Sequence, residues 1–393
     1  MRQLLILLLF LFPFPISANN FLHRDGAVIR DADNKEVKLD GVNLGGWLLW
    51  EGWIWGGKFS SQSTILSNMG KLVGPAAANS FRDDIFRHFI GEDDIRRISE
   101  LKMNVVRVPF NHRIFDTAYC NAIGWQIMDS LVHWCSKYHV YAVLDMHGAP
   151  GGQSNYFIAD PDKPYLWKTE ADKQKTVALW KKIAARYKDE RWVAGYDLLN
   201  EPIPPSDPEL VKMYNRIIPA IREVDKNHMI FLEGSQFATR FNGFTSLPDE
   251  NMAFSFHVYT FLGGKPEKKI GDHITLGQKF NVPIWCGEWG ENNYEALQHT
   301  LDVLTDPKTG FDGWCFWTWK KVKKPNSTPA LNGINVSGDW MKLIGWYCKP
   351  SEKDAVPAAT AQKLNDDFRN AMHYKNCTHD EKLSTILSNY TGK

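Results

Sequence analysis

Two short segments of the chain each end an apolar run with a glutamate. Leu198-Leu199-Asn200-Glu201-Pro202 carries Glu201, and Trp285-Cys286-Gly287-Glu288-Trp289 carries Glu288. A carboxyl group that directly follows an apolar strand lies at the edge of a core, where burial and neighbouring charges can shift its pKa. Two such carboxyls in different surroundings suit an acid and a nucleophile that work as a pair.

The reaction that this pair predicts is glycosidic cleavage by double displacement. One carboxylic acid protonates the leaving oxygen, the other carboxylate attacks the anomeric carbon, and a separation of about 5–5.5 Å preserves the configuration of the sugar. We expect Glu288 to stay ionised, with Arg107 and Tyr259 lowering its pKa. Glu201 has to start protonated, so burial and the second carboxylate should raise its pKa.

Short apolar runs recur along the chain and predict the strands that position these groups. The expected strands are Lys38–Leu44, Asn104–Pro109, Val140–Met146, Val193–Leu199, Met229–Leu232, Met252–His257, Val282–Cys286 and Gly313–Trp317. Helical periodicity falls between them, at Asp93–Leu101, Ile123–Tyr138, Thr169–Tyr187, Pro208–Val224, His273–Phe280 and Tyr294–Thr305. Eight repeats of strand and helix predict an α/β fold, a single-domain (β/α)8 TIM barrel; an open doubly wound sheet is the alternative.

Segments at both ends lie outside the eight repeats. Val28–Arg30 and Glu36–Leu39 flank a turn-rich stretch and predict a β-hairpin that closes the bottom of the barrel. The barrel is expected over residues 19–350. Residues 351–393 should form a C-terminal helix near Ala358–His373 and a tail, either packed on the barrel or partly disordered.

Residues 1–18 have the charged start, the short apolar run and the small-residue end of a secretory signal, with Ala18 as the last residue before cleavage. The apolar run Leu4–Pro15 is shorter than the roughly 18–20 residues that span a bilayer. No later segment resembles a membrane span, so we expect a secreted protein, extracellular or periplasmic.

Charge and composition narrow the class of partner. A formal net charge of +1 gives no reason to expect nucleic acid or an anionic membrane as partner. The sixteen tryptophans suit stacking on sugar rings as well as core packing. We therefore expect a neutral carbohydrate substrate and a monomeric enzyme.

Polar and aromatic residues gather where the predicted strands end, which is the working face of such a barrel. They are Asn43, Glu51, Arg107, Asn111, His112, Asp145, His147, Asn200, Glu201, Glu233, His257, Tyr259, Glu288, Glu291, Trp317 and Trp319. Asp145 is expected to support the site as a hydrogen-bonding partner, and Glu291 to be a solvated loop residue.

Neither a metal nor a cofactor is expected. The chain has no closely spaced ligand motif such as His-Glu-x-x-His, and the glycine-rich segment at residues 148–153 lacks the ending of a phosphate loop. Export would permit disulfides among the six cysteines. Cys286 and Cys315 are expected to be buried thiols, and Cys348 with Cys377 is the candidate disulfide pair.

The motifs together resemble glycoside hydrolase family 5, the cellulase-type family of retaining barrel glycosidases. The resemblance covers about residues 40–346 and rests on Gly41–Trp47, Val106–Pro109, Asp145–Gly148, Asn200–Pro202, His257–Tyr259, Gly287–Trp289 and Phe316–Lys320. It implies that Glu201 is the acid/base and Glu288 the nucleophile. It also implies that the reacting sugar is bound by Arg107, His147, Asn200, His257, Tyr259 and Trp317.

Within the family, three features make the chain most similar to the exo-β-1,3-glucanase branch: residues 43–51 with Glu51, residues 147–151 and residues 317–320. The resemblance implies that Glu51 holds hydroxyls of the terminal sugar. The chain differs from that branch at Asn111-His112-Arg113 and at Lys321-Val322-Lys323-Lys324-Pro325. Both differences fall where subsites beyond the first would form.

Three functions remain open from the sequence. The first is a secreted retaining β-glycosidase for β-glucan-type oligo- or polysaccharide. The second is a glycolipid β-glucosidase, because residues 50–54 and 155–157 are apolar enough to border a lipid. The third is a carbohydrate-binding barrel without catalysis, which the presence of both glutamates argues against.

Overall fold

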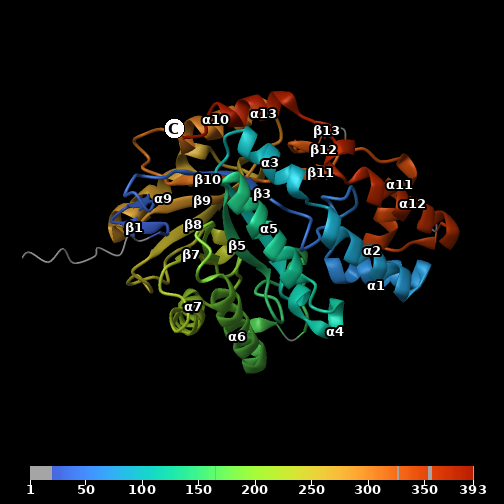
Figure 1. Cartoon of the computed structure of the whole chain (residues 1–393), viewed down its shortest axis with the longest axis horizontal. Coiled ribbons are helices and arrows are strands. Elements are labelled where there is room, and N and C mark those ends of the chain that lie inside the picture. The colour runs from blue at the N-terminus through green and yellow to red at the C-terminus, as the bar shows by residue number, and fades with distance from the viewer. Residues whose placement is uncertain (1–19, 164, 325–326, 353–355, 393) are drawn as a thin grey trace, which may run out of the picture.

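Eight parallel strands close into a barrel with helices around it, as Figure 1 shows in the computed structural model. The structure describes residues 20–163, 165–324, 327–352 and 356–392. Around the barrel the strands run in the order β10, β3, β4, β5, β6, β7, β8, β9. Their bounds are β3 Leu39–Asn43, β4 Val105–Asn111, β5 Tyr141–Gly148, β6 Val193–Asp197, β7 Met229–Glu233, β8 Met252–Val258, β9 Ile284–Trp289 and β10 Gly313–Phe316.

Burial on both faces explains why these strands read as continuous apolar runs. Every residue of β4, β8 and β9 is buried, because one side faces the barrel interior and the other faces the helices. The predicted strands are therefore confirmed, with ends that shift by a few residues. The predicted TIM barrel is confirmed as well.

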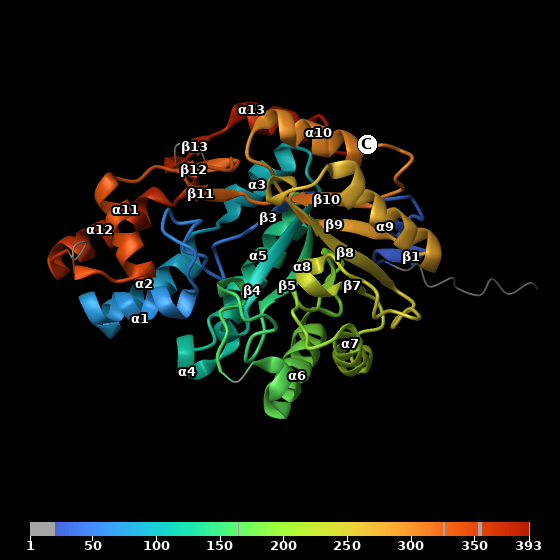
Figure 2. The same ribbon diagram turned by 180° about the vertical axis from the view of Figure 1, so that it is seen from behind.

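The helices that follow the strands cover the outside of the barrel, and Figure 2 shows them from behind. They are α3 Glu92–Glu100, α5 Gly124–Tyr138, α6 Glu170–Tyr187, α7 Asp207–Arg222, α9 Pro266–Phe280 and α10 Tyr294–Leu304. All six correspond to predicted helices. The largest difference is at α9, which begins seven residues before the predicted start because Pro266 suits the first turn of a helix.

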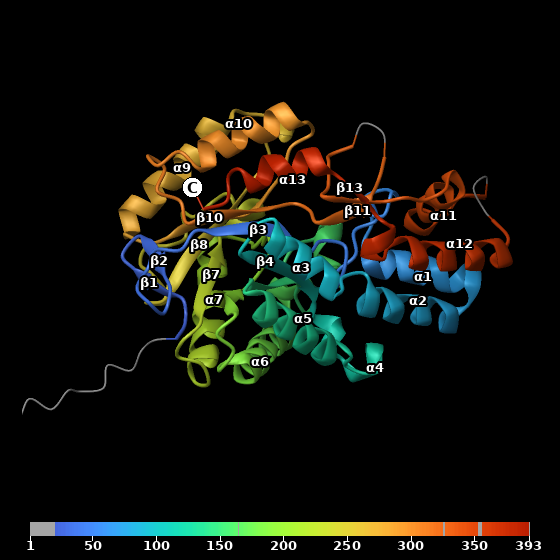
Figure 3. The same cartoon turned by 45° about the horizontal axis from the view of Figure 1, so that its top comes forward.

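Four helices form a layer beside the barrel; α12 Ala358–Ala371 is the predicted C-terminal helix, and the other three were not foreseen. α1 Gln62–Val73 and α2 Pro75–His88 lie in the connection from β3 to β4, and they contact α11 Gly338–Cys348 and α12. Figure 3 shows the four helices stacked at one side. The polar composition of α2 hides its buried side, which is formed by residues such as Phe81 and Ile85. This layer supports the long loop at residues 44–61 that leads away from β3.

A hairpin closes the bottom of the barrel, but its strands differ from those predicted. β1 His23–Asp25 pairs with β2 Val28–Arg30, and only the single bridge from Arg30 to Glu36 remains of the predicted pairing. The tight turn at Gly26, whose φ is 60°, favours the shorter hairpin. Leu22 and Ile29 pack into the apolar cluster formed by the inward-facing residues of the barrel strands.

The C-terminal region packs on the barrel. β11 Lys320–Val322, β12 Asn332–Ile334 and β13 Thr378–His379 form a small sheet, followed by α13 Glu381–Ser388. The backbone N–H of Gly392 donates to Asp40 at the barrel bottom, at 2.7 Å. The segment after α12 is thus held by a sheet, a helix and a backbone hydrogen bond.

Two other expectations concern cysteines and membrane spans. The predicted disulfide between Cys348 and Cys377 is wrong, because both are free buried thiols whose sulfurs contact different backbone carbonyls. Cys286 and Cys315 are buried thiols as predicted. The predicted signal at residues 1–18 lies outside the described residues, and none of the helices within them is long and apolar enough to cross a bilayer.

Candidate active site

The C-terminal ends of the barrel strands bring the two glutamates together. Glu288 lies in β9, and Glu201 follows β6 in a turn where its φ is 44°. This left-handed conformation is uncommon for a residue with a side chain. A carboxylate oxygen of Glu233, at the end of β7, accepts the backbone N–H of Glu201 at 2.6 Å and holds the turn.

The separation of the two carboxyls limits the chemistry that they can perform. One oxygen of Glu201, one oxygen of Glu288 and a ring nitrogen of His257 all lie within 4.8 Å of one another. Inverting glycosidases keep their carboxyls about 6.5–9.5 Å apart to admit a water molecule, whereas retaining enzymes keep them about 5–5.5 Å apart. The nearest oxygens of Glu201 and Glu288 therefore approach more closely than the carboxyls of an inverting pair.

Glu288 is held by two donors. The Tyr259 hydroxyl donates to one carboxylate oxygen at 2.5 Å, and Arg107 Nη1 donates to the other at 3.2 Å. Burial raises the pKa of Glu288 and so does Glu201, while His257 and Arg107 lower it, and the net shift is upward. The expectation of a lowered pKa was wrong, because the charges are countered by desolvation of a carboxyl that is only 6% exposed.

Arg107 is the centre of a buried ionic network. Its guanidinium contacts Asp145 at 3.1 Å, Asp197 at 2.9 Å and Glu233 at 2.8 Å, in addition to Glu288. One oxygen of each of these three carboxyls lies within 4.8 Å of the others, a grouping that a cation could use. The guanidinium already occupies that role, since it is permanently charged and donates to planar carboxylates in several directions.

His257 joins the network to the acid pair. Its Nδ1 hydrogen-bonds Glu201 at 2.8 Å, and its Nε2 forms an ion pair with Glu233 at 3.1 Å. Burial would lower the pKa of His257, but Glu233, Glu288 and Glu201 together raise it well above the ordinary value. In turn, His257 and Arg107 hold the pKa of Glu233 below its ordinary value against the effect of burial. The resulting imidazolium and carboxylate form a fixed charge pair beneath Glu201.

His147 is a second buried histidine of the site and is uncharged. Burial and the nearby Arg107 lower its pKa to about 4. Its Nδ1 hydrogen-bonds Asp145 at 2.7 Å, and its Nε2 lies 3.3 Å from the side-chain nitrogen of Asn200. The ring stacks on Trp317, with centroids 5.6 Å apart and planes 12° apart. Asp145 and Trp317 thus fix the orientation of a neutral imidazole.

Glu51 is a third carboxyl beside the pair. The indole N–H of Trp53 donates to it at 2.8 Å, and burial raises the pKa of Glu51 to about 8, with Glu288 and Glu201 adding to the shift. At neutral pH this group is a carboxylic acid that can donate as well as accept a hydrogen bond. The position of Glu51 beside the pair suits the binding of polar groups on a sugar.

Sequence reasoning missed Asp197, named Glu233 at a strand end without giving it a role, and misjudged Glu291. Asp197 and Glu233 are completely buried and bind Arg107, yet each ends an ordinary apolar strand. Their position at the end of β6 and β7 was the only signal that could have revealed them. Glu291 is buried rather than solvated, because it accepts from the backbone N–H and the hydroxyl of Thr260.

Large exposed apolar side chains also gather near this face. They are Phe59, Tyr156, Phe261 and Leu262, all in loops that follow barrel strands. Phe59 stacks on Phe157, and Phe261 packs edge-on against Tyr259, which contacts Glu288. The rim of the site is therefore partly aromatic.

A parallel barrel that carries paired, closely spaced carboxyls at the C-terminal ends of its strands is the architecture of a glycoside hydrolase. Comparison with known proteins agrees. The sequence profile described as Cellulase (glycosyl hydrolase family 5) matches residues 66–323. The chain belongs to glycoside hydrolase family 5 and is a glycoside hydrolase.

Relatives of known name are similar over most of the chain. A β-xylosidase of Phanerodontia chrysosporium is 28% identical over 342 residues, which cover 77% of this chain and 71% of the relative. A probable glucan 1,3-beta-glucosidase A of Aspergillus clavatus is 23% identical over 360 residues, which cover 75% of this chain and 86% of the relative.

Solved structures share the fold. A rutinosidase from Aspergillus niger aligns with a TM-score of 0.56 and 18% identity, over 74% of this chain and 92% of that chain. An endogalactoceramidase aligns with a TM-score of 0.55 and 20% identity, over 77% and 75% of the two chains.

Proposed function

We propose that the protein is a retaining β-glycosidase that hydrolyses β-glucosidic bonds in oligo- or polysaccharides of the β-glucan type. The observation that carries this proposal is the approach of the Glu201 and Glu288 carboxyls to within 4.8 Å, in surroundings that differ. Such a distance leaves no room for an attacking water between sugar and carboxylate. The names of the similar β-xylosidase and glucan 1,3-β-glucosidase support the β-configured substrate.

In the first step, a carboxylate oxygen of Glu288 attacks the anomeric carbon and the glycosidic C–O bond breaks. Glu201 gives its proton to the leaving oxygen, so the aglycone departs as an alcohol. Arg107 and Tyr259 hold the two oxygens of Glu288, which fixes the direction of attack. In the second step Glu201 takes a proton from a water molecule whose oxygen attacks the anomeric carbon. The bond from that carbon to Glu288 breaks, and the sugar is released with its configuration retained.

The remaining predicted residues form the sugar subsite in this proposal. Trp317 offers an apolar face, and Glu51 is a partner for sugar hydroxyls. His147 binds a sugar hydroxyl through the polar edge of its ring, and Asn200 meets the 2-hydroxyl. His257 orients Glu201 through its short Nδ1 contact.

We also propose that the protein is secreted after removal of residues 1–18. The support is the sequence pattern of those residues. A β-glucan polymer cannot cross a membrane, so an exported enzyme is consistent with such a substrate.

A second candidate function is a glycolipid β-glucosidase. The exposed Phe59, Tyr156, Phe261 and Leu262 favour it, because an apolar rim suits a lipid aglycone. Hydrolysis of glucosylceramide in mixed micelles, compared with hydrolysis of a β-gluco-oligosaccharide, separates the two functions. The third function considered from the sequence, a barrel without catalysis, is not retained because both carboxyls are held in a reactive arrangement.

The proposal is tested with the protein lacking residues 1–18 and its Glu288→Gln variant. Both are assayed on a panel of aryl β-glycosides and β-glucans, and the first-formed anomer is followed by NMR. We expect a β-anomeric product from the parent protein and loss of turnover in the variant. An α-anomeric first product would contradict the retaining mechanism.

A further inference from the structure

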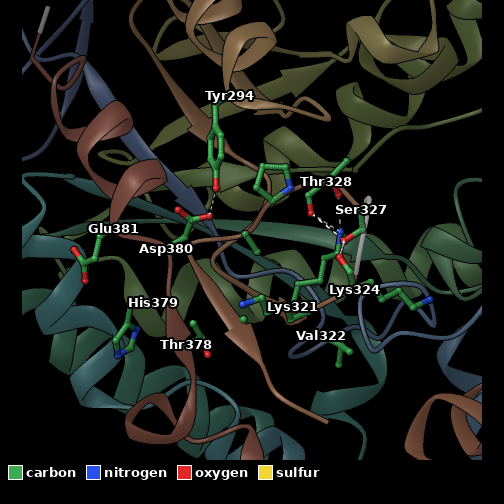
Figure 4. Close-up of a pocket in the computed structure, with 14 residues that line it drawn as sticks. Tyr294, Lys321, Val322, Lys324, Ser327, Thr328, Thr378, His379, Asp380 and Glu381 are labelled. Atoms are coloured by element: carbon green, nitrogen blue, oxygen red, sulfur yellow. Dashed lines mark hydrogen bonds between the residues drawn. The ribbon is translucent and has the colours of Figure 1, made fainter. Parts of the chain in front are cut away.

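A pocket of about 440 Å³ lies beside β11, the first strand after the barrel. Figure 4 shows the residues that line it. Its walls come from residues 321–324 and 327–330, from the start of α10 at Tyr294, and from β13 with the first residues of α13. Three lysines contribute to it: Lys321, Lys323 and Lys324. None of them belongs to the acid pair or to the Arg107 network.

The two carboxyls that line the pocket with the three lysines, Asp380 and Glu381, lie against other groups. Asp380 accepts from the Tyr294 hydroxyl at 2.7 Å and from the backbone N–H of Leu383 at 2.9 Å, so it caps α13. Glu381 forms an ion pair with Arg97 at 3.6 Å. Among the residues that the structure describes, no carboxylate forms an ion pair with any of the three lysines.

Lys321 is the most buried of the three lysines. It is only 3% exposed, and its ammonium donates to the backbone oxygen of Thr328 at 2.8 Å and to the Thr328 hydroxyl at 2.5 Å. Both acceptors are uncharged. Burial and the charge of Lys324 lower the pKa of Lys321 to about 8, and burial lowers the pKa of Lys324 as well. Bound negative charge would relieve both effects.

The surrounding groups suit an oxyanion. The Thr328 hydroxyl accepts from Lys321 and can still donate its own proton, whereas the Ser327 hydroxyl donates to the backbone oxygen of Lys324 and that of Thr378 to Asn335. Lys323 is exposed and lies along Gly333. Because Gly333 has no side chain, Lys323 has space there; a Cβ added at Gly333 would lie 3.3 Å from the Lys323 Cβ. Ammonium groups that outnumber the carboxylates of a pocket, three lysines against Asp380 and Glu381 here, favour the binding of sulfate, phosphate or carboxylate.

The pocket is also next to the reaction site. The Lys321 ammonium lies 4.9 Å from the centre of the Trp53 ring, and the Trp53 N–H donates to Glu51 beside the acid pair. Val322 bonds the backbone oxygen of Ile54 in the same loop. A group bound at the lysines would therefore be separated from the sugar subsite by the Trp53 side chain.

We propose that Lys321, Lys323 and Lys324 form an oxyanion site that receives an acidic substituent, a carboxylate or sulfate, carried by the glycan being hydrolysed. The same chemistry would accept a free inorganic anion. The glycan source rests on the proposed glycosidase function, whereas the anion site itself does not. It extends the neutral substrate expected from the net charge to β-glucosides that bear an acidic sugar.

The test uses the double variant Lys323→Gln/Lys324→Gln and a matched control, Lys182→Gln/Lys188→Gln, which removes two exposed lysines at α6. Sulfate binding is measured by titration calorimetry at constant ionic strength set with chloride. We expect saturable binding in the parent and control proteins, and at least about a fivefold loss of affinity in the double variant. Equal sulfate binding in all three proteins, or none in the parent, would overturn the site.

The source of the anion is decided by steady-state kinetics on a neutral β-gluco-oligosaccharide and on the same oligosaccharide with one glucuronic acid unit. For a site that binds the substrate, the parent has a KM about threefold to tenfold lower for the acidic substrate, and the double variant loses that preference. Sulfate binding without this preference would overturn the glycan source and assign the site to a free anion. Hydrolysis of the neutral substrate should be unchanged in the double variant, so failure of the glycosidase proposal would show separately as no turnover by the parent.

Discussion

Buried carboxyls lie at both ends of this barrel, and they are satisfied in different ways. At the C-terminal ends of the strands, Asp145, Asp197, Glu233 and Glu288 all contact one guanidinium. At the opposite end, Asp40 accepts the backbone N–H of Gly392, and Asp312 accepts those of Ile29 and Ile284. The first end is an ionic network of side chains, and the second uses carboxyls as caps for backbone N–H groups.

The difference teaches what burial alone does to a carboxyl and what a site adds to it. Burial raises the pKa of Asp40 and that of Asp312 to about 7. The network instead gives its members different pKa values. The pKa of Glu233 is lowered, whereas burial raises that of Asp145 to about 8. The site thus gives neighbouring buried carboxyls different pKa values, which burial alone does not. The bottom carboxyls serve closure of the barrel.

The largest effect should come from Glu288→Gln. The amide keeps acceptors and donors near Tyr259 and Arg107 but cannot attack carbon, so we expect kcat to fall by about 10⁴-fold or more. Asp312→Asn at the other end is the matched control and should keep kcat within about threefold. Initial rates on an aryl β-glucoside measure both. Comparable losses in the two variants would erase the functional distinction between the ends.

A smaller and more selective loss is expected for Glu201→Gln. Without the acid, a substrate with a poor leaving group such as an alkyl β-glucoside should lose about 10³-fold in kcat/KM. A dinitrophenyl β-glucoside needs no proton on its leaving oxygen, so the loss in its first step should be far smaller. The dependence of log kcat/KM on leaving-group pKa is the measurement. An equal loss for both substrates would remove Glu201 from the acid role.

Next in size is the stability effect of Glu233→Gln. This change removes the ionic partner of Arg107 and His257 inside the barrel, which we expect to cost about 3–5 kcal/mol of unfolding free energy. Glu291→Gln is the control, since Glu291 is also buried but meets only neutral donors, and about 1–2 kcal/mol is expected there. Urea unfolding compares the two. A Glu233 variant as stable as the Glu291 variant would contradict the ionic network.

The smallest expected effect is a change in how the free energy of unfolding depends on pH, caused by Asp312 at the barrel bottom. Because the pKa of Asp312 is about 7 in the folded protein and about 3.8 when unfolded, the folded state holds a proton that the unfolded state releases. The stability from this group is present below pH 4 and is lost as pH rises towards 7. Asp312→Asn should reduce the slope of unfolding free energy by up to about 1.4 kcal/mol per pH unit over that interval. The exposed Asp339→Asn should leave the slope unchanged, and an unchanged slope in both variants would contradict the assignment.

The strands and the identity of the rim residues could be predicted because each strand is buried on both faces until its polar end. Glu201 and Glu288 stand out because they follow apolar runs. Glu233 and Asp197 follow apolar runs too, but nothing in the sequence says that their carboxyls turn inward to Arg107. That is decided by the register of the closed barrel.

Other features depended on contacts between distant segments. The helix α2 is polar in composition, so its buried side becomes evident only when α11 and α12 pack nearby. The sign of the Glu288 pKa shift was mistaken because the sequence shows charges but not desolvation. The free thiols of Cys348 and Cys377 depend on a separation that spacing along the chain does not give.

The most direct test of the account is to trap the sugar on the enzyme. The substrate is the activated 2-deoxy-2-fluoro-β-glycoside of the sugar that the panel identifies, because fluorine slows both steps while a good leaving group lets the first proceed. Intact-protein mass spectrometry should show one added fluoroglycosyl group, and peptide mapping should locate it on Glu288. A label on another residue, or turnover with inverted product and no label, would contradict the account.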